Sequence, residues 1–236
     1  MTAQTLLIHE TANPRPPGRV SHNVNGQRLG RKGRDTRERI LAAAVELIQE
    51  EGDTPVSLSA VARRASLGMT SLYSYFADFS ELIVAVLEPV MAEAEARFLR
   101  LAREPWPDEE LGERAQAFIA AFYAFWERNS RILHLRNSLA DQMDVRMMEH
   151  RIRSAQPVIR NFIRQMHHDP REVKTAAAGM ATVLYIGIER MVAVTTDVTM
   201  PKVLPAHFAP DIEHLIEAEG RLLELGIREY RSRARP

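Results

Sequence analysis

Apolar side chains recur with helical spacing along most of the chain from Asp35 onward. No stretch shows the strict alternation of apolar and polar residues that marks a half-buried strand. The sequence therefore predicts an all-α protein. In the first periodic segment, TRERILAAAVELIQEEG, Gly52 marks the expected helix end, and the apolar positions form one stripe: Ile40, Leu41, Ala44, Val45 and Ile48.

Two short helices are predicted after this segment. Ser57 is a suitable N-cap for a helix over residues 58–64, and a turn at 66–68 separates it from a helix over 70–76. Asp78 precedes Glu81 by three residues, which is the spacing of a capping box at the start of a further helix. Three helices with a tight turn between the second and third indicate a helix-turn-helix unit.

Longer helices account for the rest of the chain. A connector is expected to begin at Ser130, and Pro157 should kink the helix that contains it, because proline lacks the N–H that the helix needs. Asp169-Pro170 has the pattern of a cap followed by proline at the first helical position. These longer helices are predicted to begin at Asp108 and then to cover residues 139–166, 169–196 and 211–230.

Three parts of the chain are predicted from this pattern. Residues 1–34 are rich in proline and glycine and lack periodicity, so we expect a disordered basic arm. Residues 35–80 form the helix-turn-helix domain. Residues 81–236 form a larger helical domain.

The distribution of charge changes the picture that the net charge gives. The formal net charge is zero, which by itself argues against binding to nucleic acid. However, residues 1–34 carry six lysines and arginines against one acidic residue. We therefore expect basic side chains of the arm, and Arg37 just after it, to contact DNA phosphates. These side chains are Arg28, Arg31, Lys32, Arg34 and Arg37.

The stretch ASLGMTSLYSYF contains no lysine or arginine. Hydroxyl groups and backbone N–H groups at helix starts also bind phosphates, and Tyr75 is the first choice for such a contact. Alternatives stay open: a tyrosine could fill the small core, and the arm could be a tail that happens to be basic. The hydroxyl residues predicted to contact DNA are Ser57, Thr70, Ser71, Tyr73, Ser74 and Tyr75. Arg63 is predicted to add a positively charged contact.

Residues 35–87 resemble the tetracycline-repressor (TetR) family of bacterial transcription regulators. The resemblance rests on TRERILAAAVELIQEEG, VSLSAVARRASLGMTSLYSYF and DFSELIVAVL. It implies that residues 70–76 are the recognition helix, that Leu72 and Phe76 pack inward, and that the protein binds a palindromic double-stranded operator.

The chain departs from the family pattern at three positions. Ser66 stands where the turn commonly begins with glycine, and Met69 and Ala77 stand where lysines commonly contact phosphate. These departures shift the expected phosphate contacts toward the basic residues at 28–37.

The resemblance also implies roles for the larger domain. A small-molecule effector would bind there and move the recognition helices apart, and the last two helices would form a homodimer. Methionine and aromatic side chains suit an adaptable apolar pocket, although such a stripe is also typical of a plain core. The predicted ligand-binding residues are Phe118, Phe122, Trp126, His134, Met143, Met147, Phe162 and Met180.

Other classes of protein have little support in the sequence. The chain contains no cysteine, and HExxH, P-loop and G-x-S-x-G motifs are missing. We expect no metal or cofactor, no apolar run long enough to span a membrane, and a cytoplasmic location. An all-α enzyme and a ligand-independent helical interaction protein remain as alternatives to a ligand-responsive repressor.

Overall fold

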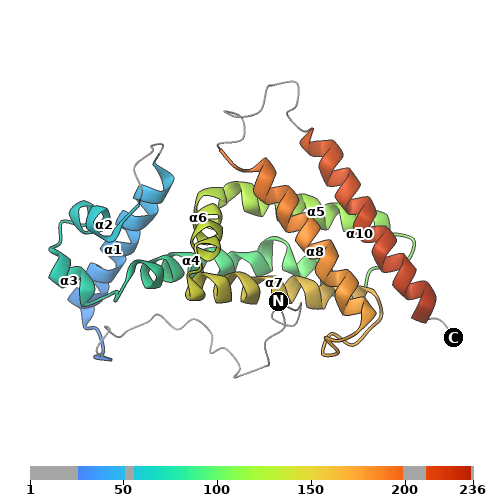
Figure 1. Ribbon diagram of the computed structural model, residues 1–236, viewed down its shortest axis with the longest axis horizontal. Helices are drawn as coiled ribbons and strands as arrows, with labels where there is room; N and C mark the ends of the chain where they lie inside the picture. The colour runs from blue at the N-terminus through green and yellow to red at the C-terminus, as the bar shows by residue number, and fades with distance from the viewer. Residues whose placement is uncertain (1–25, 51–55, 199–210, 235–236) are drawn as a thin grey trace. The chain divides into compact units, whose positions relative to one another are not determined.

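The structure is a computed structural model that describes residues 26–50, 56–198 and 211–234 (Figure 1). These ranges contain helices and no β-strand, so the predicted all-α fold is confirmed. The helices are α1 (Arg31–Gln49), α2 (Leu58–Arg64), α3 (Met69–Tyr73), α4 (Phe79–Arg97), the 3₁₀ helix η2 (Leu99–Ala102), α5 (Leu111–Arg128), α6 (Ser130–Asp141), α7 (Val145–Gln165), α8 (Ala176–Thr195) and α10 (Ile212–Ala234).

The described residues divide into two compact units. The N-terminal unit contains residues 26–90 together with 135–150, and the C-terminal unit contains residues 91–134 together with those from 151 onward. The helix-turn-helix segment therefore packs with the end of α6 and the start of α7. A domain boundary at residue 80 stays a prediction.

The core of the N-terminal unit follows the predicted stripe. Ile40 and Ala44 of α1 are buried with Val61 of α2 and Leu72 of α3. The N–H of Ala60 donates to Ser57 Oγ at 3.3 Å, so Ser57 caps α2 as expected. Val45, which was placed on the inner stripe, is partly exposed.

The start of α4 has the predicted capping box with one difference, since Glu81 accepts from the N–H of Ala77, the residue before the N-cap, and not from Asp78 itself. The N–H of Glu81 donates to Asp78 Oδ1 at 2.8 Å, and the N–H of Ala77 donates to Glu81 Oε2 at 2.6 Å. This exchange satisfies backbone donors that have no partner inside the helix.

In the C-terminal unit, α10 packs closely on α5 and beside α8. Gly220 of α10 is essential for this approach, because a Cβ there would lie 2.9 Å from the Cα of Gln116 on α5. The buried Gln165 and Arg231 join α7 to α10, with Arg231 Nε donating to the Gln165 carbonyl at 2.6 Å. One face of α10 is thereby held on the core.

By length and composition, α8 passes a test for a membrane-crossing helix, the only one to do so among the described residues. Core helices of other proteins pass the same test, so this is weak evidence of a span. Ala177, Ala181 and Ile188 of α8 are buried within the unit.

The prediction of a disordered arm was wrong for residues 31–34, which form the first turn of α1. Leu29 is buried and anchors the chain before the helix, and Arg34 Nη1 donates to the Leu29 carbonyl at 3.2 Å. Residues 1–25, Gly52 and the proline-containing loop at 199–210 lie outside the described residues.

Other predicted helix boundaries were also wrong: α3 ends at Tyr73 instead of residue 76, and the connector expected from Ser130 is the helix α6. The expected helix over 139–166 is interrupted, because α6 ends at Asp141 and Met143 takes a positive φ of 69° before Asp144 caps α7. The expected helix from Asp169-Pro170 begins later, where Thr175 Oγ1 accepts from the N–H of Ala178 at 3.1 Å. Pro157 lies inside α7 as predicted.

Candidate nucleic-acid interface

The turn between α2 and α3 is built on Ser66. Ser66 has a φ of 53°, and its N–H donates to the Arg63 carbonyl at 3.1 Å. The N–H of Leu67 donates to the Ala62 carbonyl at 2.9 Å, which completes the pattern of a Schellman motif. Arg39 of α1 donates to the Ala65 carbonyl at 3.0 Å and so fixes the turn against the first helix.

The short helix α3 presents hydroxyl groups to solvent. Leu72 is fully buried, which turns Thr70, Ser71 and Ser74 outward. Tyr73 is 48% exposed, so the alternative that it fills the core does not hold. Thr70, Ser71, Tyr73 and Ser74 all lie on the exposed surface of the unit, as the sequence predicted.

Three of the predicted hydroxyl contacts carry a local constraint. Ser74 Oγ donates to the Thr70 carbonyl at 3.2 Å, which leaves its oxygen free to accept. Ser57 Oγ already accepts from Ala60 and lies 3.1 Å from Ser59 Oγ. Tyr75 is half-buried, between the exposed Tyr73 and the buried Phe76.

The distribution of charged residues around α2 and α3 favours the binding of a polyanion. The sequence from Thr54 to Ala77 contains no acidic residue. Arg63 is exposed, whereas Arg64 forms ion pairs with Glu46 at 3.3 Å and Glu50 at 2.6 Å. The hydrogen bond from Arg64 lowers the pKa of Glu50. Arg63 is therefore the better placed of the two arginines for a phosphate.

Positive charge also gathers at the start of α1. Arg31, Lys32 and Arg34 are exposed in the first turn of the helix, which contains no acidic residue. The helix dipole already makes this end positive, so basic residues are unfavourable there unless an anion is bound nearby. Arg28 is exposed just before the helix, and the Arg37 guanidinium lies 5.1 Å from the centre of the Phe76 ring.

A reciprocal pair of contacts holds the start of α4 against the start of α7. Arg146 Nη1 donates to Asp78 Oδ1 at 2.6 Å, and Ser80 Oγ donates to Asp144 Oδ2. Asp78 and Asp144 are the N-cap residues of the two helices. Sequence reasoning missed this contact, because its partners lie more than 60 residues apart. An aspartate followed two residues later by serine or arginine, as in Asp78 with Ser80 and Asp144 with Arg146, is not a sequence motif that predicts such a contact.

The predicted ligand-binding residues are divided between the two units. Phe118, Phe122 and Phe162 come together in the C-terminal unit, with ring centres 6.3 Å apart for Phe118 and Phe122 and 5.3 Å apart for Phe118 and Phe162. Trp126 joins this cluster through Phe122. His134 lies 6.0 Å from Trp126 between ring centres, and its Nε2 is 3.1 Å from Thr196 Oγ1.

The three methionines do not join the aromatic cluster. Met147 is buried in the N-terminal unit, and Met143 is 70% exposed at the end of α6. The prediction placed both on one continuous helix, and the break at Met143 removes that alignment. Met180 lines a groove between α8 and α10.

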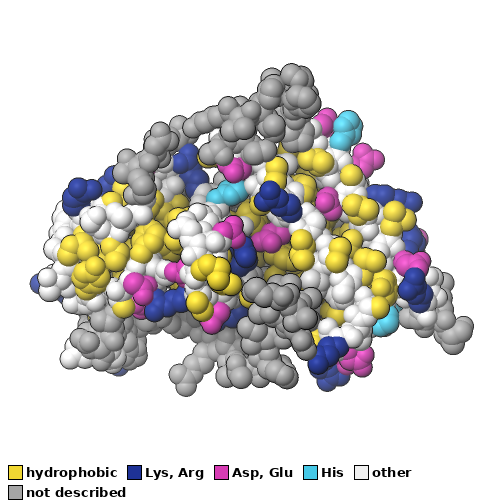
Figure 2. All heavy atoms as spheres, in the orientation of Figure 1, with side chains coloured by type: hydrophobic (Ala, Val, Ile, Leu, Met, Phe, Trp, Pro, Cys, Tyr) yellow, Lys and Arg dark blue, Asp and Glu magenta, His cyan; other side chains and the backbone are white. Residues whose placement is uncertain are grey.

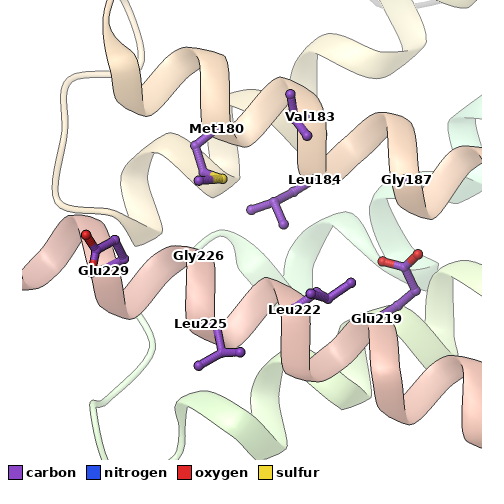
Figure 3. Close-up of a pocket in the computed structure, with 9 residues that line it drawn as sticks. All are labelled: Met180, Val183, Leu184, Gly187, Glu219, Leu222, Leu225, Gly226 and Glu229. Carbon is purple, nitrogen blue, oxygen red and sulfur yellow. The ribbon is translucent and has the colours of Figure 1, made fainter.

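This groove between α8 and α10 has a volume of about 480 Å³ and is almost entirely apolar (Figure 3). Hydrophobic side chains gather over both helices on the face that Figure 2 shows. Val183, Ile186, Leu222 and Leu225 are exposed there. Ile188 of α8 and Leu223 of α10 are instead buried in the core of the unit.

The comparisons with known proteins agree with this geometry. Residues 40–86 match the sequence pattern of the bacterial regulatory proteins of the tetR family. A TetR-like transcriptional regulator from Rhodococcus sp. RHA1 is 18% identical, with a TM-score of 0.52, over 89% of this chain and 100% of that one. A TetR/AcrR-family regulator from Thermobifida fusca is 19% identical, with a TM-score of 0.51, over 80% of this chain and 97% of that one. No curated protein matches.

The helix-turn-helix geometry and the sequence match over residues 40–86 together support a DNA-binding transcription regulator. The sequence match assigns its DNA-binding domain to the tetR family of bacterial regulatory proteins. At these identities, the two solved structures support the fold and nothing finer.

Proposed function

We propose that the protein is a ligand-responsive, homodimeric repressor whose uncharged recognition helix reads bases while the first turn of α1 neutralises phosphates. The observation that carries this proposal is the arrangement of Thr70 and Ser71, which are exposed on α3 above the buried Leu72. Short hydroxyl side chains contact base edges and phosphates without formal charge. Arg31, Lys32 and Arg34 then supply the positive charge that α3 lacks.

The homodimer is proposed to form through the apolar face of α8 and α10. Four large apolar side chains are exposed on this one face, and a contiguous exposed apolar patch marks an interaction site. A two-fold contact would present two copies of α3, and two-fold symmetry in the protein matches a palindromic operator.

The effector is proposed to be a small apolar or aromatic compound that binds beside Trp126. Phe122 and Trp126, which are buried side by side, would line the apolar part of such a site, and His134 with Thr196 would supply a polar pair at its edge. Effector binding would release the repressor from its operator. The same proposal places the protein in the cytoplasm, where its DNA lies.

Selection from a pool of randomised DNA duplexes tests the DNA-binding part of the proposal. We expect the wild-type protein to enrich a palindromic sequence. A Thr70→Ala/Ser71→Ala variant should change the bases that are enriched. Tyr75→Phe should instead weaken binding by about 1 kcal/mol through one lost hydrogen bond and leave the enriched sequence unchanged. If no sequence rises above the input pool, the reading of α3 as a recognition helix is wrong.

Tryptophan fluorescence tests the effector. The chain has two tryptophans, so Trp106→Phe leaves Trp126 as the only tryptophan. A panel of apolar and aromatic compounds should contain at least one that shifts this emission and also lowers operator affinity. If no compound alters either the emission or the melting temperature, the proposed effector site is wrong.

A further inference from the structure

Glu219 is an acidic side chain at one end of the largely apolar groove between α8 and α10. It rises from α10 toward Gly187 of α8, with its carboxylate oxygens 3.7 and 3.8 Å from where a Gly187 Cβ would lie (Figure 3). Leu222 and Val183 line the same groove. Within the described residues, the Glu219 carboxylate has no ion pair and no hydrogen bond to a protein group.

The charged groups on the neighbouring elements do not compensate Glu219. From α8, the residues that line the groove are Met180, Val183, Leu184 and Gly187, all uncharged, and the exposed Arg190 lies beyond it. On α10, Arg221 is ion-paired with Glu224 at 2.7 Å.

The remaining neighbours of Glu219 provide no cation to pair with its carboxylate either. Where α5 meets α10, beneath Gly220, it contributes the uncharged Gln116. Glu229 lines the far end of the groove and is paired with Arg233 at 2.6 Å. Burial alone raises the pKa of Glu219, and no other group contributes to the shift.

We propose that self-association of this protein is linked to proton uptake at Glu219, so that the α8–α10 contact strengthens as the pH falls. This inference rests on the proposed homodimer and names its regulation. A second copy that covers the groove along Val183, Leu222 and Leu225 also covers the carboxylate at its end, beside Leu222. Removing an unpaired carboxylate from water favours its neutral form.

The direction of the pH dependence follows from linkage. A carboxyl group whose pKa is raised in the dimer binds more protons in the dimer than in the free protomer. Dimerisation is therefore strongest below the pKa of Glu219 in the free protomer and weakens as the pH rises through its pKa in the dimer. Each proton taken up changes the dimer dissociation constant by about tenfold per pH unit within that window.

Sedimentation equilibrium of the full chain, from about pH 5.5 to about pH 8, tests the inference. This pH range lies above the ordinary glutamate pKa of about 4.3, so a carboxyl group with an ordinary pKa would stay ionised throughout it. We expect the wild-type dimer to loosen at least tenfold across this range. Glu219→Gln, which mimics the neutral form, should be tighter than wild type at the high end and nearly independent of pH. Glu229→Gln is the matched control, from the same groove and helix, and should retain the wild-type pH dependence.

The outcomes separate this inference from the proposed dimer. A wild-type dimer whose dissociation constant does not change with pH overturns the proton linkage and leaves the dimer standing. A Glu219→Gln variant that dimerises more weakly than wild type also overturns it, because Glu219 then pairs as a charged group with a cation of the second copy. A chain that stays monomeric at every pH overturns both the dimer and the linkage.

Discussion

Arg146 Nη1 donates to both carboxylate oxygens of Asp78, at 2.6 Å and 2.7 Å. The two residues belong to the starts of α7 and α4, and the bond between Ser80 and Asp144 lies alongside. Each N-cap aspartate thus binds the residue two positions after the other N-cap. The helix-turn-helix segment is held in this way to a part of the chain far away in sequence.

Loss of the Arg146–Asp78 pair should destabilise the N-terminal unit modestly. Both side chains are about half exposed, so the pair is expected to contribute about 0.5–1 kcal/mol. Arg146→Met should lower the free energy of unfolding by that amount in urea titrations, and added salt should reduce the difference. Arg97→Met removes an exposed pair within one helix and should cost about 0.3 kcal/mol. Equal effects of the two variants would contradict a special role for the contact between α4 and α7.

Asp144 should make stability depend on pH. Partial burial alone would raise its pKa, but the hydroxyl of Ser80 and the backbone N–H groups of Met147 and Arg146 outweigh this effect and lower the pKa. The stabilisation is therefore complete above the unfolded-state pKa of about 3.9 and is lost as the pH falls through the lower folded-state pKa. Wild type should be more stable than Asp144→Asn near neutral pH, with the difference shrinking below about pH 4. A difference that stays constant down to about pH 2 would argue against this assignment.

Ser66→Gly should stabilise the helix-turn-helix unit. Ser66 is exposed and has a φ of 53°, a conformation that costs a residue with a Cβ roughly 1 kcal/mol. Glycine loses more conformational entropy on folding, so the expected net gain is about 0.5 kcal/mol. Ser71→Gly, inside α3, should instead lower stability by about 0.5 kcal/mol. The two variants are compared by thermal unfolding, and a loss of stability in both would contradict the role given to the turn.

Adjacent leucines of α10 should respond differently to a charge. Leu222 is 53% exposed on the groove face, whereas Leu223 is fully buried against the core. Leu222→Asp should yield a folded monomer, as measured by light scattering and circular dichroism. Leu223→Asp should fail to fold, because it buries an unpaired carboxylate within the protomer. A Leu222→Asp variant that remains dimeric at micromolar concentration would remove α10 from the proposed interface.

The sequence predicted the helix-turn-helix core, but it did not predict several helix ends. α2 and the capping box at Asp78 follow from local residue patterns, which is why they were found. The turns after α2, α6 and α7 use Ser66, Met143 and His167 at positive φ, where glycine is the usual signal. Because no glycine marks the end of α6, the apolar pattern predicts one continuous helix through the break at Met143.

The candidate sites were predictable to the extent that they depend on one helix. The outward direction of Thr70 and Ser71 follows from the burial of Leu72 on the same short helix. The contact between Asp78 and Arg146 depends on how distant segments pack, and no local pattern encodes it. The proposed role of Glu219 likewise depends on its facing Gly187 across two helices.

The central claim is that the first turn of α1 neutralises phosphates while the uncharged α3 reads bases. The most direct test is the salt dependence of operator binding by the wild type and by an Arg31→Ala/Lys32→Ala/Arg34→Ala variant, with Arg171→Ala as a control from the C-terminal unit. Each phosphate neutralised contributes about −0.9 to the slope of log K against log salt. We predict that the triple variant flattens this slope by roughly 2–4 per dimer, for one or two lost phosphate contacts in each protomer, while the control leaves it unchanged. Equal slopes for the wild type and the triple variant would contradict the claim.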